Sequence, residues 1–193
     1  QIHGWNSEYP IEESMESMRL LQKQGKTRFI GVSNFNADQI SQALQTAHFT
    51  SSQPRYNMFD REIEREDIDF CQQFGIGILA HSPLAKGLLT GKYSPDFQFP
   101  SDDERSNYYR FQGKLFSQYL AAADKLKKIA HQKGVTLVQL SIAWALRLPA
   151  ISCVLVGAKT ADQVREQAVA ATITLSDDEL KMISQILATA PES

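Results

Sequence analysis

The sequence is poor in cysteine, has no dominant charge and lacks any long apolar run. Its 193 residues include two cysteines, Cys71 and Cys153, far apart in apolar stretches. We interpret both as buried thiols in a reducing compartment, because small secreted domains that rely on disulfides carry more cysteines. The 20 lysines and arginines nearly balance the 22 aspartates and glutamates. This balance argues against nucleic-acid binding and against a polybasic membrane anchor.

No apolar stretch approaches the roughly 20 residues that a membrane-spanning helix needs. The first residues, Gln1-Ile2-His3, have neither the basic region nor the apolar region of a signal peptide. We therefore expect a cytoplasmic protein with no membrane partner and no nucleic-acid partner. The chain begins without methionine, at residues that resemble the middle of a strand, so we expect it to be part of a longer protein.

Strand-like and helix-like segments alternate along the chain. Strands are expected at residues 1–3, 28–32, 53–57, 76–80 and 151–156, and a charged amphipathic helix is expected at 62–74. Capping residues indicate further helix starts at Asn36 or Asp38, at Thr136, at Thr160 or Asp162, and at Ser176. Alternation of this kind indicates a single domain over residues 1–193, with a parallel sheet and helices outside it.

Two architectures fit this pattern, an open doubly wound sheet and a (β/α)8 barrel. A complete barrel takes about 250 residues, so this chain would supply about the last five βα units. The segment from Leu84 to about Lys114 has no helical or strand period, and a loop of this length is typical of a lid or a functional segment. We interpret the charged run from Asp60 to Asp69 as a solvated helix face.

In both architectures, ligands bind where the parallel strands end. The residues at these ends are His3-Gly4-Trp5, Ser33-Asn34-Phe35, Gln53 with Tyr56-Asn57, His81-Ser82-Pro83 and Gly157-Ala158-Lys159. Serine, asparagine and glutamine side chains both donate and accept, which suits a ligand that carries an amide. Histidine is suited to acid/base chemistry or to stacking. The free backbone N–H groups and the lysine at 157–159, at the start of a helix, predict a phosphate site.

Each of these groups also has a purely structural interpretation. His3 fits a hydrogen-bonded structural residue, Ser33-Asn34 a turn with an N-cap, and Trp5 simple packing. The segment 87–92 is not a P-loop, because three residues rather than four separate its glycines and Tyr93 follows its lysine. A loop with Lys86 and Lys92 can still approach a pyrophosphate. The sequence has no GxGxxG, CxxC or HExxH motif, so it supports neither a Rossmann site nor a metal site.

Taken in order, these segments resemble the aldo-keto reductase family. The resemblance is carried by residues 1–5, 25–35, 82–92 and 156–159, and by Gln53 with Tyr56-Asn57. It implies a (β/α)8 TIM barrel of the aldo-keto reductase type, of which this chain is the C-terminal portion, and a cofactor, NADP(H), bound without a Rossmann motif. It also implies an oxidoreductase that reduces aldehydes and ketones by hydride transfer, with a tyrosine as general acid beside a lysine, an aspartate and a histidine.

The same resemblance implies a role for each candidate residue. His3 corresponds to the catalytic histidine, and Trp5 to a wall of the substrate pocket. Ser33, Asn34 and Gln53 would hold the nicotinamide carboxamide. The remaining residues would stack on the nicotinamide (His81), lie at the pyrophosphate (Ser82, Pro83, Leu84, Lys86, Gly87 and Lys92), or bind the adenosine 2′-phosphate and adenine (Gly157, Lys159, Thr160, Gln163 and Gln167).

Three departures from the family pattern bear on function. No tyrosine, lysine or aspartate of this chain matches the rest of the catalytic tetrad. We therefore expect the isolated chain to be a poor catalyst, since general acid catalysis contributes about 10²–10⁴-fold. His81 stands where a tyrosine usually stacks, with a smaller ring. Gln163 stands where an arginine often binds phosphate, so Lys159 would supply the charge, and NAD(H) is the alternative cofactor.

Two other hypotheses stay open on sequence alone. Some family members are regulatory subunits of potassium channels, so the chain could belong to a non-catalytic, NADP-binding regulatory or scaffold subunit of the same fold. An unrelated parallel α/β protein with accidental matches is the third hypothesis. The sequence identifies neither the carbonyl substrate nor the oligomeric state.

Overall fold

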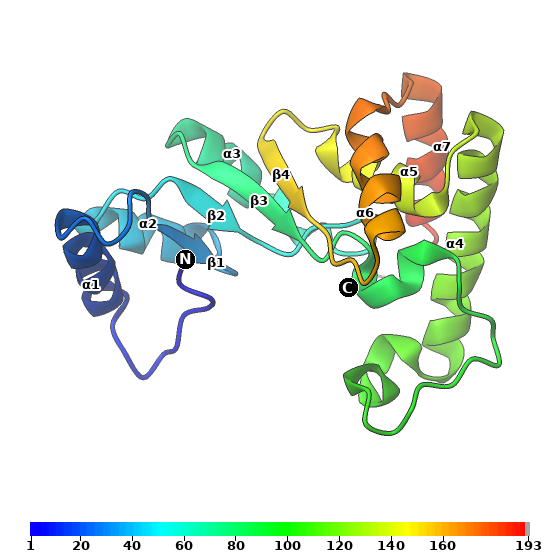
Figure 1. Ribbon diagram of the computed structural model, residues 1–193, viewed down its shortest axis with the longest axis horizontal. Coiled ribbons are helices and arrows are strands. Elements are labelled where there is room, and N and C mark those ends of the chain that lie inside the picture. The colour runs from blue at the N-terminus through cyan, green and yellow to red at the C-terminus, as the bar shows by residue number, and fades with distance from the viewer. Residues whose placement is uncertain (192–193) are drawn as a thin grey trace. The chain divides into compact units, whose positions relative to one another are not determined.

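A computed structural model describes residues 1–191 of the chain (Figure 1). The described residues form two compact units. The first contains Gln1–Tyr56, Arg61–His81 and Leu148–Leu155, and the second contains Asn57–Asp60, Ser82–Arg147 and the residues from Val156 onward. The single domain that the sequence predicts over residues 1–193 stays a prediction.

The first unit is built on a four-stranded parallel sheet. Its strands β1 (Gly31–Ser33), β2 (Ser51–Gln53), β3 (Gly77–His81) and β4 (Ile151–Leu155) lie in chain order across the sheet (Figure 1). A Cβ on Gly31 would lie 2.6 Å from the Ser51 carbonyl, so only glycine fits at the start of β1. Ile2 pairs with Val32 through a single parallel bridge, so the strand expected at residues 1–3 is reduced to that bridge.

The α-helices of the first unit are α1 (Ile11–Lys23), α2 (Ala37–Thr46) and α3 (Asp67–Gln73). α1 and α2 pack together and bury Ile11, Met15 and Ile40. Asn36 begins α2 with a capping box. Asp67 accepts a further hydrogen bond from the Ala37 N–H at 3.0 Å. Side chains therefore satisfy two of the N–H groups that a helix start leaves without a partner.

Three sequence predictions in these segments need correction. The helix expected at 62–74 is divided into a 3-10 turn, η1 (Glu62–Glu64), and α3. In the charged run from Asp60 to Asp69, Glu62, Arg65, Glu66 and Asp69 are exposed as the sequence predicts. The prediction fails at Asp60, which is buried. The strand expected at 53–57 is instead β2 at Ser51–Gln53, followed by a single parallel bridge between Arg55 and His81.

Both cysteines are free, as the sequence predicts. Cys71 is buried in α3, and this burial, with the nearby charge of Asp67, raises the pKa of its thiol to about 11. Cys153 in β4 is only partly buried, so the expectation of two buried thiols holds for Cys71 alone. A thiol with so high a pKa stays protonated and unreactive near neutral pH.

The second unit contains α4 (Gly113–Lys133), α5 (Leu137–Leu146), α6 (Ala161–Val169) and α7 (Asp177–Leu187) (Figure 1). α4 packs against α5 and α7, and Lys133 donates to Glu179 at 2.9 Å. α5 is largely buried, including Trp144. The capping boxes predicted at Thr136 and Ser176 are confirmed. Within residues 1–191, no helix is long and apolar enough to span a membrane.

The long loop that precedes α4 has its own aromatic cluster. It contains the 3-10 turns η2 (Ala85–Thr90), η3 (Glu104–Asn107) and η4 (Tyr109–Phe111). The ring of Tyr93 lies 4.7, 5.3 and 5.8 Å from the rings of Phe97, Phe99 and Phe111. Aromatic packing and short 3-10 turns order this segment, and its role as a lid or functional segment stays a prediction.

Replacing Ser176 with alanine should lower the free energy of unfolding by about 1 kcal/mol, because it removes the hydroxyl that accepts from the Glu179 N–H. The matched control is Ser184→Ala on the exposed face of α7. It should leave the free energy of unfolding unchanged or slightly higher, since alanine is the better helix former. Urea unfolding followed by circular dichroism measures both variants. Equal losses would contradict the capping role.

Candidate functional site

Asn34 is the centre of a polar cluster in the first unit, where β1 ends. Its backbone has φ 55°, in the left-handed region, and its N–H donates to the Gln53 carbonyl at 3.2 Å. Its amide nitrogen donates to the His3 carbonyl at 3.2 Å, and its amide oxygen lies 2.8 Å from Nε2 of His81. Since an amide oxygen only accepts, this contact assigns the proton of the His81 ring to Nε2.

Ser33 and Gln53 complete this cluster. Ser33 is buried, and its hydroxyl donates to the Gln53 carbonyl at 2.7 Å. The side-chain nitrogen of Gln53 donates to the side-chain oxygen of Gln1. The N-cap of α2 is Asn36, so Ser33 and Asn34 are not that cap. The structure brings Ser33, Asn34, Gln53 and His81 together, and their role towards a cofactor stays a prediction.

His3 and Trp5 lie on the exposed N-terminal segment of the first unit. The carbonyl of His3 accepts from Asn34, which links this segment to the end of β1. Trp5 is exposed, at 38%, and its Nε1 donates to the Tyr9 carbonyl at 2.8 Å. A local hydrogen bond therefore orients Trp5. The catalytic role of His3 and the pocket role of Trp5 stay predictions.

In the second unit, the segment that begins at Ser82 is a strained turn. Ser82, Ala85 and Lys86 have φ values of 57°, 47° and 54°, which side chains with a Cβ seldom adopt. Gly87 follows at φ 103°, and a Cβ there would lie 2.7 Å from the Tyr93 hydroxyl. Pro83 is buried, and the Leu84 carbonyl accepts from Gly87 and Leu89. Such outliers gather at binding sites more often than elsewhere.

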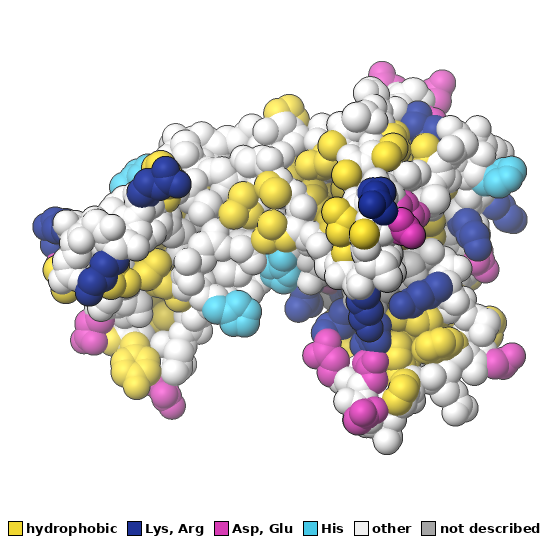
Figure 2. Space-filling model, in the orientation of Figure 1, with side chains coloured by type: hydrophobic (Ala, Val, Ile, Leu, Met, Phe, Trp, Pro, Cys, Tyr) yellow, Lys and Arg dark blue, Asp and Glu magenta, His cyan; other side chains and the backbone are white. Residues whose placement is uncertain are grey.

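A group of cations lies beside this turn. Burial, followed by the charges of Arg105 and Lys159, lowers the pKa of Lys92. Lys92 is therefore close enough to Arg105 and to Lys159 to be repelled by both. Figure 2 shows Lys and Arg side chains gathered on one part of this unit. Such a cluster favours the binding of an anion, which would relieve the repulsion.

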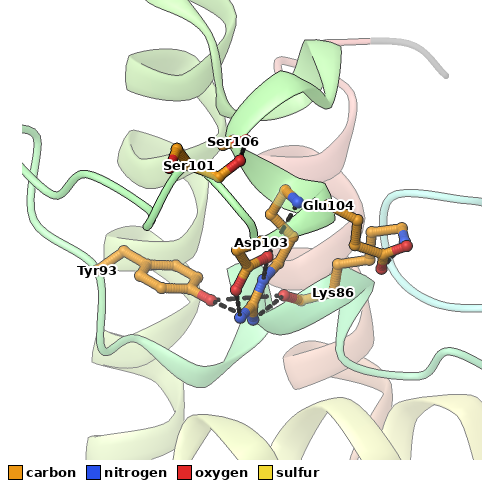
Figure 3. A network of polar contacts seen from close by, with 7 residues as sticks. Lys86, Tyr93, Ser101, Asp103, Glu104 and Ser106 are labelled. Atoms are coloured by element: carbon orange, nitrogen blue, oxygen red, sulfur yellow. Dashed lines mark hydrogen bonds and ion pairs between the residues drawn. The ribbon is translucent and has the colours of Figure 1, made fainter.

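Carboxylates of the same loop partly neutralise these cations (Figure 3). Asp103 accepts from Arg105 at 2.8 and 2.5 Å, and these hydrogen bonds hold the pKa of Asp103 well below its usual range. Arg105 also donates to the Tyr93 hydroxyl at 3.1 Å. Lys86 pairs with Glu104 at 2.5 Å. Arg105 is absent from the sequence predictions, because no motif or period connects it to Lys92.

The segment from Gly157 to Gln167 corrects one prediction. The sequence suggested free N–H groups at 157–159, but the Lys159 N–H donates to the side-chain oxygen of Gln163 at 2.6 Å. Gln167 donates to the Gly157 carbonyl at 3.0 Å. Thr160 begins α6 as its N-cap, as predicted. Two glutamines of α6 thus bond to the backbone just before the helix, and any phosphate would have to compete with Gln163 for the Lys159 N–H.

Comparisons with known proteins agree on one family. The model of the Aldo/keto reductase family matches residues 1–188. Aldo-keto reductase YhdN of Bacillus subtilis is 35% identical over 188 residues, which cover 97% of this chain and 57% of that protein. A probable voltage-gated potassium channel subunit beta of Arabidopsis thaliana is 34% identical over 202 residues, which cover 98% of this chain and 61% of that protein.

A solved structure gives the same result. The glycerol dehydrogenase AKR11B4 of Gluconobacter oxydans matches with a TM-score of 0.91 and 35% sequence identity, over 100% of this chain and 60% of that chain. The chain therefore spans little more than half the length of the known proteins that it matches.

The affinity of the second unit for an anion should depend on the charge of Lys92. An anion favours the protonated amine and so raises the pKa of Lys92. Affinity is then greatest below the pKa that Lys92 has in the free chain, and it falls as the pH rises through the pKa in the complex. Because the pKa of free Lys92 is lowered, this loss should begin at a lower pH than for an ordinary lysine.

Titration with inorganic sulfate, which does not change its charge in this range, measures the effect by NMR. Lys92→Gln should weaken sulfate binding at neutral pH and remove the alkaline loss. Lys181→Gln, on the exposed face of α7, should change neither. An alkaline loss that persists in Lys92→Gln would exclude Lys92 as its source.

Proposed function

We propose, from the premise that the chain belongs to the aldo/keto reductase family, that it binds NADP(H) for the reduction of aldehydes and ketones to alcohols. The family and the barrel fold that the sequence predicts are confirmed by the family match and by the solved structure of similar fold. Bound NADPH would supply a hydride to the carbonyl carbon, and a proton on the oxygen completes the alcohol. That the whole protein reduces carbonyl compounds is likewise part of what we propose.

The amide of Asn34 is the observation that carries the proposal. A primary amide has two donors and two lone pairs. The contacts with His3 and His81 use one of each. One N–H and one lone pair of an exposed side chain are therefore left for a ligand. The nicotinamide carboxamide offers the complementary acceptor and donor, so the residues of the first unit fit this part of the cofactor.

The cations of the second unit fit the phosphates of the cofactor. Arg105 and Lys159 both repel the charge of Lys92. Asp103 pairs with Arg105 on a partly exposed part of the loop. We propose that a phosphate of the cofactor takes the place of that carboxylate. Lys86 is paired with the exposed Glu104, and we propose that a phosphate takes the place of this carboxylate as well.

His3 is the proposed catalytic residue, where its imidazole would orient the substrate carbonyl and assist proton transfer. The family resemblance assigns no residue of this chain as the general acid, so we propose that the isolated chain binds the nucleotide without turning over substrate. A cytoplasmic location belongs to the same proposal, and the two free cysteines support a reducing compartment.

A regulatory subunit is the second candidate function. It is favoured by the similarity to a protein named as a probable voltage-gated potassium channel subunit beta. The two candidates differ in one property of the protein isolated from its natural source. A reductase oxidises NADPH when a carbonyl substrate is present, whereas a regulatory subunit binds NADPH and leaves it reduced.

The isolated chain should bind NADPH, seen as a change in nicotinamide fluorescence, and should show no carbonyl-dependent loss of reduced nicotinamide. The reason is that the candidate residues at the nicotinamide and the phosphates are present, whereas none takes the general-acid role. Absence of binding would contradict the proposed function. Turnover at rates ordinary for reductases would contradict the expected inactivity of this chain.

Lys159→Ala should weaken NADPH binding about tenfold, the loss expected for one hydrogen bond to a charged group. It should leave NADH binding nearly unchanged, since only NADPH carries the 2′-phosphate. Lys181→Ala on α7 is the control and should alter neither cofactor. Equal losses for both cofactors would assign Lys159 to the pyrophosphate, and no loss would remove it from the site.

A further inference from the structure

A buried polar network in the second unit has no part in the proposed chemistry. Arg110, in η4 at the end of the long loop, makes a two-point ion pair with Asp60. Its Nη1 lies 2.9 Å from Oδ2, and its Nη2 lies 2.6 Å from Oδ1. The two side chains are 3% and 5% exposed. Nε of Arg110 donates to the Tyr109 hydroxyl, so the guanidinium is held from two sides.

Asn57 connects this ion pair to the strained turn. Its amide nitrogen donates to Oδ2 of Asp60 at 2.8 Å and to the Ser82 carbonyl at 2.9 Å. Its amide oxygen accepts from the N–H groups of Phe59 and Asp60. Both donors and both lone pairs of the amide are then used. A flipped amide would direct its oxygen at the Asp60 carboxylate, so the ion pair fixes the orientation of Asn57.

Ser82 is where the strained turn begins. Its carbonyl accepts from Asn57 and from the Ala85 N–H at 3.0 Å, which closes the turn. The Arg110 side chain therefore connects the end of the long loop to the network that holds Ser82 at its start. A segment of 29 residues, from Ser82 to Arg110, has both ends fixed by three buried side chains.

We propose that Asp60 and Arg110 are positioning residues for the nucleotide-binding turn. They orient the Asn57 amide, which holds the Ser82 carbonyl and so sets the backbone that the pyrophosphate meets. The inference deepens the proposed function and rests on it, since it assigns a nucleotide to this turn. Stability alone is a weak explanation for the pair, because buried ion pairs can often be replaced by apolar side chains of similar volume without loss.

The decisive variant replaces both charges at once, Asp60→Leu with Arg110→Met. The apolar pair can keep the urea unfolding midpoint near that of the native chain, while Asn57 loses its anchor. We expect its dissociation constant for NADPH to rise about tenfold, the equivalent of one lost hydrogen bond to a charged group. Asn57→Ala should cause the same rise. The triple variant should be no weaker than either, because the residues act in series.

The exposed ion pair between Lys181 and Asp178 on α7 supplies the control. Lys181→Gln should change neither NADPH binding nor the unfolding midpoint. Hydrogen exchange in the absence of nucleotide gives an independent measure. The amides of Ala85, Gly87 and Leu89, which close the turn, should exchange faster in Asn57→Ala and in the double variant, while the amides of α4 keep their native rates.

These outcomes separate the two proposals. If the native chain does not bind NADPH, the proposed function fails, and hydrogen exchange still tests whether the network holds the turn. Unchanged exchange and unchanged NADPH binding in both variants would overturn the positioning role. The positioning role would also be overturned if NADPH binding weakened only in proportion to the fall in the unfolding midpoint, since a purely structural role predicts that result. If the double variant does not fold, Asn57→Ala alone decides between these results.

Discussion

Parallel pairing of the strands is the constraint on which the first unit depends. Because β1 to β4 all run in one direction, the residues that follow them meet at the same edge of the sheet. The residue after β1 must turn sharply there, and Asn34 does so with a left-handed backbone that asparagine tolerates better than most residues. The turn then places its amide between the His3 carbonyl and the His81 ring. One backbone feature thus organises the polar cluster.

The main constraint on the second unit is that several cationic side chains lie close together. Arg105 and Lys159 repel the charge of Lys92, while Asp103 pairs with Arg105 and Glu104 pairs with Lys86 on the same loop. Both ion pairs are partly exposed. In the proposed function these carboxylates occupy the places of the phosphates and keep the cations ordered before the ligand binds. Because the side chains are already ordered in the free protein, less conformational entropy is lost when a ligand binds.

Local signals account for what the sequence could predict. The capping boxes at Thr136 and Ser176 depend on residues within a few positions of one another. Asp60 pairs with Arg110, which lies 50 residues away in the sequence. The charged run that begins at Asp60 has the pattern of a solvated helix face, so the residues around Asp60 do not indicate this pair. Arg105 lies in a segment without a period. Gln163 caps the Lys159 N–H through a side-chain rotamer, which no residue spacing encodes.

The strained turn explains why a buried polar network lies beside the segment that we propose to bind the nucleotide. Ser82, Ala85 and Lys86 each adopt a backbone conformation that costs about 1–3 kcal/mol and persists only where the surroundings impose it. A solvated loop could relax from such a conformation, and a long loop has many alternatives. Asn57 removes that freedom at Ser82, and Asp60 with Arg110 removes it from Asn57. An apolar contact in their place could supply stability but not direction, whereas a saturated amide holds one carbonyl in one place.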